Sequence, residues 1–204
     1  GSQMWGLTVQ NFLSAATGSA VLMAFVRGLV RRSAETIGNF WADMVRTVVY
    51  ILLPVSLVLS LFFISQGALQ SLGSYVSVET LEGGSQTIPL GPAASQVAIK
   101  QFGTNGGGFF NANGAHPFEN PTPLTNFIQQ LAIIALPAAM VYGFGILIKS
   151  RLHAWLLLGV MFIIWMIGFV IAYYSEWIID PVLVAYPVLE GEEMRFGTVN
   201  SVLW

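Results

Sequence analysis

Long apolar stretches separated by short polar or charged connections dominate the chain. Four of them, at about residues 5–26, 45–64, 127–148 and 154–174, are almost free of charged side chains. Each is close to the roughly 20 residues with which an α-helix crosses a 30 Å hydrocarbon core. Pro54 and Pro137 fall inside two of these stretches, and membrane helices tolerate proline where neighbouring helices satisfy the freed carbonyls. The pattern therefore predicts an all-α membrane protein with four transmembrane helices.

The composition supports this prediction. Of 204 residues, 55% are hydrophobic and 9% are charged, with a mean hydropathy of +0.70, whereas about a quarter of the residues of a soluble domain are charged. The chain holds no cysteine, which excludes disulfide scaffolds and thiolate metal sites. The expected environment is a lipid bilayer, and no nucleic-acid partner is expected.

The charged residues predict how the helices are oriented. The first and third connections carry basic residues: Arg27, Arg31, Arg32, Arg46, Lys149 and Arg151. The long second connection and the tail carry most of the acidic residues: Glu79, Glu82, Glu119, Glu176, Asp180, Glu190, Glu192 and Glu193. Basic loops of membrane proteins stay on the cytoplasmic side. The second connection is therefore expected to open to the outside.

That second connection, at about residues 65–124, is far longer than a typical linker. Residues 66–92 are rich in Gly, Ser and Thr and predict an exposed excursion with turns. Residues 93–102, AASQVAIKQF, favour a helix that is too short to span a bilayer. We interpret it as a re-entrant helix that enters the membrane and ends at Gly103.

Four glycines follow this short helix: Gly103, Gly106, Gly107 and Gly108. Glycine reaches φ values closed to other residues, so successive carbonyls can face one axis. Carbonyl rings of this kind replace the hydration shell of a cation in potassium channels, and a helix C-terminus adds negative potential. The alternatives are a flexible loop and a close-packing device. A phosphate-binding loop is disfavoured, because the sequence lacks G-x-x-x-x-G-K-[ST] and the loop faces outward.

Residues near the glycines are candidates for an outer vestibule: Asn111, Asn113 and Glu119. Glu119 would concentrate cations there, although a role in the local turns near proline is favoured. Lys100, at the end of the short helix, is interpreted as a partner of the helix dipole.

Amide side chains lie near the outer ends of the first and third apolar stretches: Gln10, Asn11, Asn126, Gln129 and Gln130. Polar groups are costly in lipid, so they are expected to face protein. Interhelical hydrogen bonding is favoured over lining a pore. The residues LTVQNFL from position 7 and LTNFIQ from position 124 also match weakly at a spacing of about 117 residues, which suggests two copies of a helix, pore loop and helix unit.

Residues 103–122, GTNGGGFFNANGAHPFENPT, resemble the second selectivity-filter loop of a known family. This family is the potassium-binding A subunit of the bacterial Kdp potassium-transporting ATPase. Residues 2–18, which contain GLTVQNFLSAATG, and the RFG at 195–197 resemble it in the same order. The resemblance thus covers essentially the whole chain, and its central string is long and unusual.

The resemblance implies a subunit with four pseudo-repeated pore units around one filter, related to potassium channels. Thr104, Asn105 and Gly106 would offer oxygens to K⁺, and Gly107 and Gly108 would allow the turn. K⁺ would be the transported ion and would pass through an intramembrane tunnel to a P-type ATPase partner, the B subunit, in a complex with C and F subunits in the bacterial inner membrane. ATP would be bound by that partner, since this chain shows no D-K-T-G motif. The chain itself is then not an enzyme.

The chain differs from that family in length, because a complete A subunit is more than twice as long. The resemblance divides it into residues 1–42, which close a first pore unit, residues 43–150, a complete second unit, and residues 151–204, the start of a third. It is therefore expected to be a fragment or one piece of a split subunit. Two rival hypotheses are a channel assembled from several copies of this chain and a structural membrane protein without an ion site.

Overall fold

The computed structural model describes residues 1–31, 33, 35–110, 113–179 and 194–203. Four helical segments are long and apolar enough to cross a membrane. They are α1 (Ser2–Val30), a segment made of α2 (Phe40–Thr47), a π-helical turn (Val48–Leu52) and α3 (Leu53–Ser65), then α5 (Pro123–Leu147) and α6 (Arg151–Ile179). The prediction of an all-α membrane protein is confirmed, and each predicted stretch coincides with one of these segments, the third extending one residue past the end of α5.

The remaining elements are short. They are α4 (Ala93–Phe102), a 3₁₀ turn (Met194–Phe196) and α7 (Gly197–Val202), together with one antiparallel hairpin of β1 (Val76–Glu79) and β2 (Ser85–Ile88). The hairpin occupies the part of the chain that was expected to form only turns and loops. Its residues are exposed apart from the half-buried Ile88, so little in their pattern distinguished a strand from a loop.

Local sequence fixes where α5 begins. The Thr122 hydroxyl accepts a hydrogen bond from the Thr125 main-chain N–H, and the Thr125 hydroxyl accepts one from the Thr122 N–H. This reciprocal arrangement satisfies donors that an uncapped helix would leave open. Pro123 follows at the first helical position, where its missing N–H has no cost.

The second spanning segment accommodates Pro54 by widening its helix. In the π turn the Leu53 N–H bonds to the Val48 carbonyl, one residue farther back than in an α-helix. Pro54 lies near the start of α3, and a proline inside a regular α-helix would clash with the carbonyl four residues earlier. The wider turn precedes the ring and makes room for it.

Helix α4 is enclosed by the longer helices α1, α3 and α5. All of its residues except Ser95 are buried, and its alanines pack against Phe63 of α3 and Ile128 of α5. A short helix at membrane depth is stable only when protein surrounds its ends. The predicted short helix, ending at Gly103, is confirmed.

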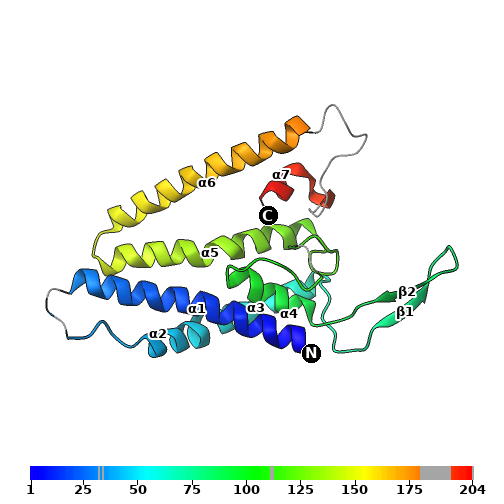
Figure 1. Cartoon of the computed structure of the whole chain (residues 1–204), viewed down its shortest axis with the longest axis horizontal. Coiled ribbons are helices and arrows are strands. Elements are labelled where there is room, and N and C mark those ends of the chain that lie inside the picture. Colours follow the sequence, from blue (N-terminus) through cyan, green and yellow to red (C-terminus); the bar gives the residue numbers. More distant parts are fainter. Residues whose placement is uncertain (32, 34, 111–112, 180–193, 204) are drawn as a thin grey trace.

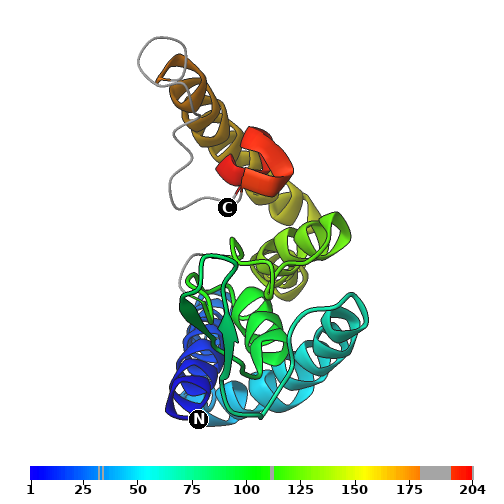
Figure 2. The same ribbon diagram turned by 90° about the vertical axis from the view of Figure 1, so that its right-hand side faces the viewer.

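The two ends of the helix group differ (Figure 1). The connection after α1 and the turn between α5 and α6 lie at one end, and the hairpin and the N-terminus lie at the other. At the first end Arg27 of α1 forms an ion pair with Asp43 of α2. Figure 2 shows α6 leading away from the other helices.

Candidate functional site

The glycine loop begins at a tightly bonded helix end. The Asn105 N–H donates to the Lys100 carbonyl at 3.0 Å and the Thr104 N–H to the Gln101 carbonyl at 3.1 Å, the paired bonds of a Schellman cap. This cap places Thr104 at φ 57, where glycine is usual. A β-branched residue in that region is strained, so the surrounding structure must hold it there.

Two different structural requirements call for glycine in this loop, a left-handed backbone at one position and close packing at another. Gly107 uses the left-handed region, with φ 81, as predicted for this run. Gly103 has an ordinary φ of −74 and is instead required by space, because a Cβ there would lie 2.7 Å from the Ile99 carbonyl oxygen and 2.9 Å from that of Asn11. Gly103 therefore lets α1 approach the end of α4.

The side chain of Asn105 ties the loop to α1. Its Oδ1 accepts hydrogen bonds from the Ser14 hydroxyl at 2.9 Å and from Gln10 Nε2 at 3.3 Å. Its Nδ2 donates to the carbonyls of Asn11 at 3.2 Å and Gly103 at 2.7 Å. The amide is thus fully engaged within the protein, and the main-chain carbonyl is the oxygen that Asn105 can offer to an ion.

The first half of the loop lies at the surface of this chain. Thr104, Gly106 and Gly107 are exposed, and Asn105 and Gly108 are half-buried. A Cβ added at Gly106 would meet nothing within 4 Å. Two of the three residues predicted to supply oxygens, Thr104 and Gly106, are therefore exposed.

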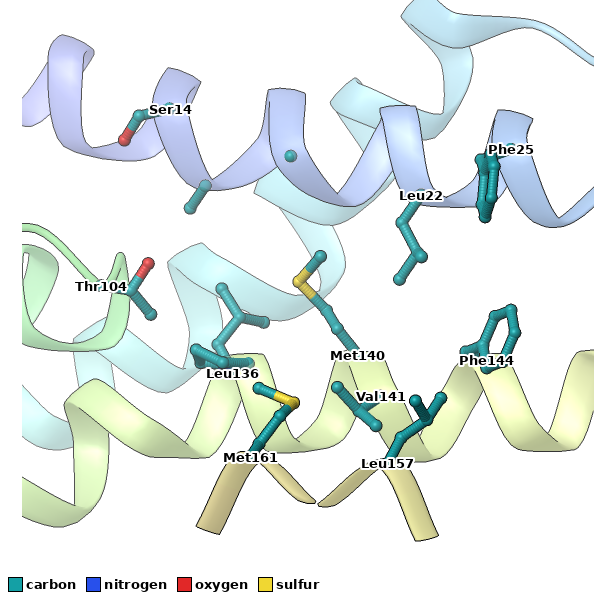
Figure 3. Close-up of a pocket in the computed structure, with 13 residues that line it drawn as sticks. Ser14, Leu22, Phe25, Thr104, Leu136, Met140, Val141, Phe144, Leu157 and Met161 are labelled. Atoms are coloured by element: carbon teal, nitrogen blue, oxygen red, sulfur yellow. The ribbon is translucent and has the colours of Figure 1, made fainter. Parts of the chain in front are cut away.

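A cavity of about 570 Å³ extends from Thr104 between α1, α5 and α6. Figure 3 shows Ser14 and Thr104 at one end of it, with Met140 and Phe144 of α5 facing Leu22 of α1 farther along. Nearly all of its walls are apolar side chains, so Ser14 and Thr104 provide its polar end.

The second half of the loop turns back onto the protein. The N–H groups of Phe109 and Phe110 both donate to Oε1 of Glu119, the second at 3.3 Å. The Phe109 carbonyl accepts a hydrogen bond from Gln3 of α1 at 3.0 Å. The Phe110 ring stacks on His116, with ring centroids 4.3 Å apart.

Glu119 and Lys100 are both completely buried, with 0% of each exposed. Burial raises the pKa of Glu119, while the charge of Lys100 and the two loop N–H groups oppose that rise. Burial lowers the pKa of Lys100 to about 8, against the opposing effect of Glu119. Within the described residues, Lys100 Nζ and Glu119 Oε2 have no hydrogen-bond partner, and no direct ion pair joins the two side chains.

These positions differ from the sequence interpretation. Glu119 does not face an open vestibule, because its carboxylate is turned inward onto the loop amides. Lys100 lies in the last turn of α4, as expected of a partner of the helix dipole, but α1, α3 and α5 cover this helix and its side chain is buried. Asn113 is half-buried, and its Oδ1 has no partner in the described part of the chain. Asn111 lies outside the described residues.

The amide side chains join α4, α5 and the loop, as predicted for interhelical hydrogen bonding. Gln101 of α4 donates to Gln129 of α5 at 3.1 Å, and Gln129 donates to the Glu119 carbonyl at 3.0 Å. Asn126 accepts from Asn120 at 2.9 Å. Arg195 also donates to the Asn120 carbonyl at 2.7 Å, which no sequence pattern indicated.

The whole chain, residues 1–204, matches the family described as "Potassium-transporting ATPase A subunit". The chain belongs to this family. Among curated members, the "Potassium-transporting ATPase potassium-binding subunit" proteins of Solibacter usitatus and Rhodopseudomonas palustris are each 52% identical to it over 207 residues. The protein of the same name from Pseudomonas syringae pv. tomato is 50% identical over 208 residues.

These alignments cover 100% of this chain but 36% to 37% of each family member. The chain therefore spans little more than a third of the length of the potassium-transporting ATPase A subunits that it matches. The part of the family's length that this chain spans includes the buried helix α4, the glycine loop and four segments long enough to cross a membrane.

Proposed function

We propose that this chain supplies one potassium-filter loop, with its flanking helices, to the potassium-binding subunit of an ATP-driven potassium uptake pump. The observation that carries the proposal is the glycine loop at the C-terminal end of the buried helix α4, with Thr104, Gly106 and Gly107 exposed. The names of the relatives support potassium as the ion. The chain itself carries no proposed catalytic role, and ATP hydrolysis belongs to a partner.

The physical basis is the replacement of hydration by protein oxygens. Thr104, Asn105 and Gly106 would present oxygens to a dehydrated K⁺, and Gly107 and Gly108 would form the turn that aligns them. The negative end of the α4 dipole points into the same region and favours a cation there. A single loop supplies one side of such a site, so residues 43–150 would act as one pore unit beside others of the same kind.

The proposed setting follows from the family and the arrangement of charge. The protein would be a multi-pass protein of the bacterial inner membrane, with the glycine loop outside and the basic connections inside. Residues 1–42 would close one pore unit, and residues 151–204 would open another. Potassium would leave the loop by way of the cavity that begins at Thr104 and pass to a P-type ATPase B subunit, in a complex with C and F subunits.

The test is Gly106→Asp in the complete pump. Among the described residues, no atom lies within 4 Å of a Cβ added at Gly106, so a loss of transport would not follow from a clash at that atom. We expect the potassium concentration for half-maximal ATPase activity to rise at least tenfold. Gly84→Asp, a change of the same charge in the hairpin turn, should leave it unaltered. An unchanged potassium response in purified Gly106→Asp complex would refute the proposal.

A further inference from the structure

The contacts of Glu119 fix the orientation of two peptide groups in the loop. A trans peptide holds its N–H and C=O in one plane and pointing in opposite directions, and the described chain has no cis peptide bond. The Phe109–Phe110 peptide illustrates this, because its N–H meets Glu119 while its carbonyl meets Gln3 of α1.

The same reasoning applies one residue earlier. The Phe109 N–H points at Glu119, so the Gly108 carbonyl of that peptide points away from Glu119. Among the described residues no group donates a hydrogen bond to this carbonyl, and Gly108 itself is half-buried. The contact that orients this peptide thus leaves its oxygen available.

The main chain around Glu119 is held in place by hydrogen bonds, so its carboxylate can orient these peptide groups. Its main-chain carbonyl is held by Gln129, which is itself held by Gln101. The next residue, Asn120, accepts a hydrogen bond from Thr125 at 2.7 Å through its side chain. The carboxylate therefore projects from an anchored backbone toward the main-chain N–H groups of Phe109 and Phe110.

Lys100 supplies the opposite charge. A buried carboxylate without a compensating charge is strongly unfavourable, and the charge of the buried Lys100 opposes the rise that burial causes in the pKa of Glu119. Lys100 lies on α4, four residues before Thr104, where the loop begins. Lys100 thus precedes the start of the glycine loop, and Glu119 binds the N–H groups of Phe109 and Phe110 at its other end.

We propose that Glu119 is a positioning residue that directs the Gly108 carbonyl toward the ion, with Lys100 as its buried counter-charge. The inference rests on the proposed potassium-filter function. On this proposal, the Glu119 carboxylate does not contact the ion, but it affects how well the filter distinguishes ions of different size.

Two double variants in the complete pump separate charge balance from peptide orientation. Lys100→Met/Glu119→Gln removes both charges but keeps an oxygen that accepts from Phe109 and Phe110. Lys100→Met/Glu119→Met also removes both charges and has a side chain of similar length, but it has no such acceptor. Each complex is purified, and its ATPase activity is titrated with K⁺ and with Rb⁺. Glu82→Gln, in the exposed hairpin turn, is the control.

The methionine double variant should need at least tenfold more K⁺ for half-maximal activity than the glutamine double variant, with a smaller difference between K⁺ and Rb⁺. Maximal activity should be similar in the two. Equal half-saturation and equal ion preference in both variants would overturn the inference. If the double variants do not assemble, Glu119→Asp serves instead, because it keeps both charges and withdraws the carboxylate by one methylene. It should raise the K⁺ requirement, and an unchanged value would overturn the inference.

These outcomes remain distinct from failure of the proposed function. If wild-type complex responds to K⁺ and Gly106→Asp abolishes the response, the filter stands whatever the Glu119 variants show. If neither wild type nor Gly106→Asp depends on K⁺, the proposed function itself fails.

Discussion

At the scale of single residues, burial explains the two charged groups beside the loop. Transfer of a lone charge into protein costs several kcal/mol, so buried lysines and glutamates are retained where something compensates them. Here the compensation is mutual and comes from α4 and from the loop that follows it. The sequence did not indicate a link between Lys100 and Glu119, because they are nineteen positions apart and the effect of each charge on the other depends on how the loop folds back.

The pKa of Lys100 makes stability depend on pH. It is about 8 in the folded chain, against 10.5 for an ordinary lysine, so between these values the unfolded chain binds more protons than the folded one. The free energy of unfolding should therefore rise as pH increases from about 8 to 10.5. Thermal unfolding of the purified complex across this range measures the rise, which Lys100→Met should abolish. A rise that persists in Lys100→Met would have another origin.

At the scale of elements, the sequence predicted helices correctly where the apolar pattern was long or where a glycine marked the end of a helix. The four spanning stretches and the end of α4 at Gly103 follow from hydropathy, helix length and glycine. The hairpin and the π turn did not follow, because their residues are mostly exposed or apolar and carry no periodicity that differs from a loop or a plain helix. The roles of Gln3 and Ser14 on α1 required tertiary contacts with the loop.

The cap of α4 gives a prediction of its own. Thr104 occupies the left-handed position that glycine normally fills. Thr104→Gly should relieve this strain and raise the free energy of unfolding by about 1 kcal/mol. It should also weaken K⁺ activation, since the hydroxyl at the mouth of the cavity is removed. Thermal unfolding and K⁺ titration of the same preparation test both effects. Loss of stability would show that the loop does not hold Thr104 under strain.

At the scale of the whole molecule, both basic connections lie at one end of the helix group, and the hairpin of the second connection, which also carries the glycine loop, lies at the other. This is the arrangement that the positive-inside rule requires if the loop faces outward. Hydropathy and charge therefore suggested the layout of the chain. They did not indicate how closely α4 is enclosed, because that depends on the fit of its alanines against the surrounding helices.

The orientation can be measured directly because the chain contains no cysteine. In intact cells, a membrane-impermeant maleimide should label Glu82→Cys in the hairpin turn but not Ser33→Cys in the first connection. Both positions are exposed, so accessibility does not distinguish them. Ser33→Cys should react after the cells are opened. Labelling of Ser33→Cys in intact cells would place the basic connections outside.

The π turn before α3 has a further consequence. Between Val48 and Leu52, close to Pro54, the π turn contains one residue more than the same length of α-helix would. Deleting one residue there would return the backbone to regular spacing while keeping α2 and α3 facing as they do now, but the proline ring would then meet the carbonyl four residues back. The extra residue and the proline are therefore linked: deletion alone is costly, and the shortened helix becomes acceptable once Pro54 is also replaced.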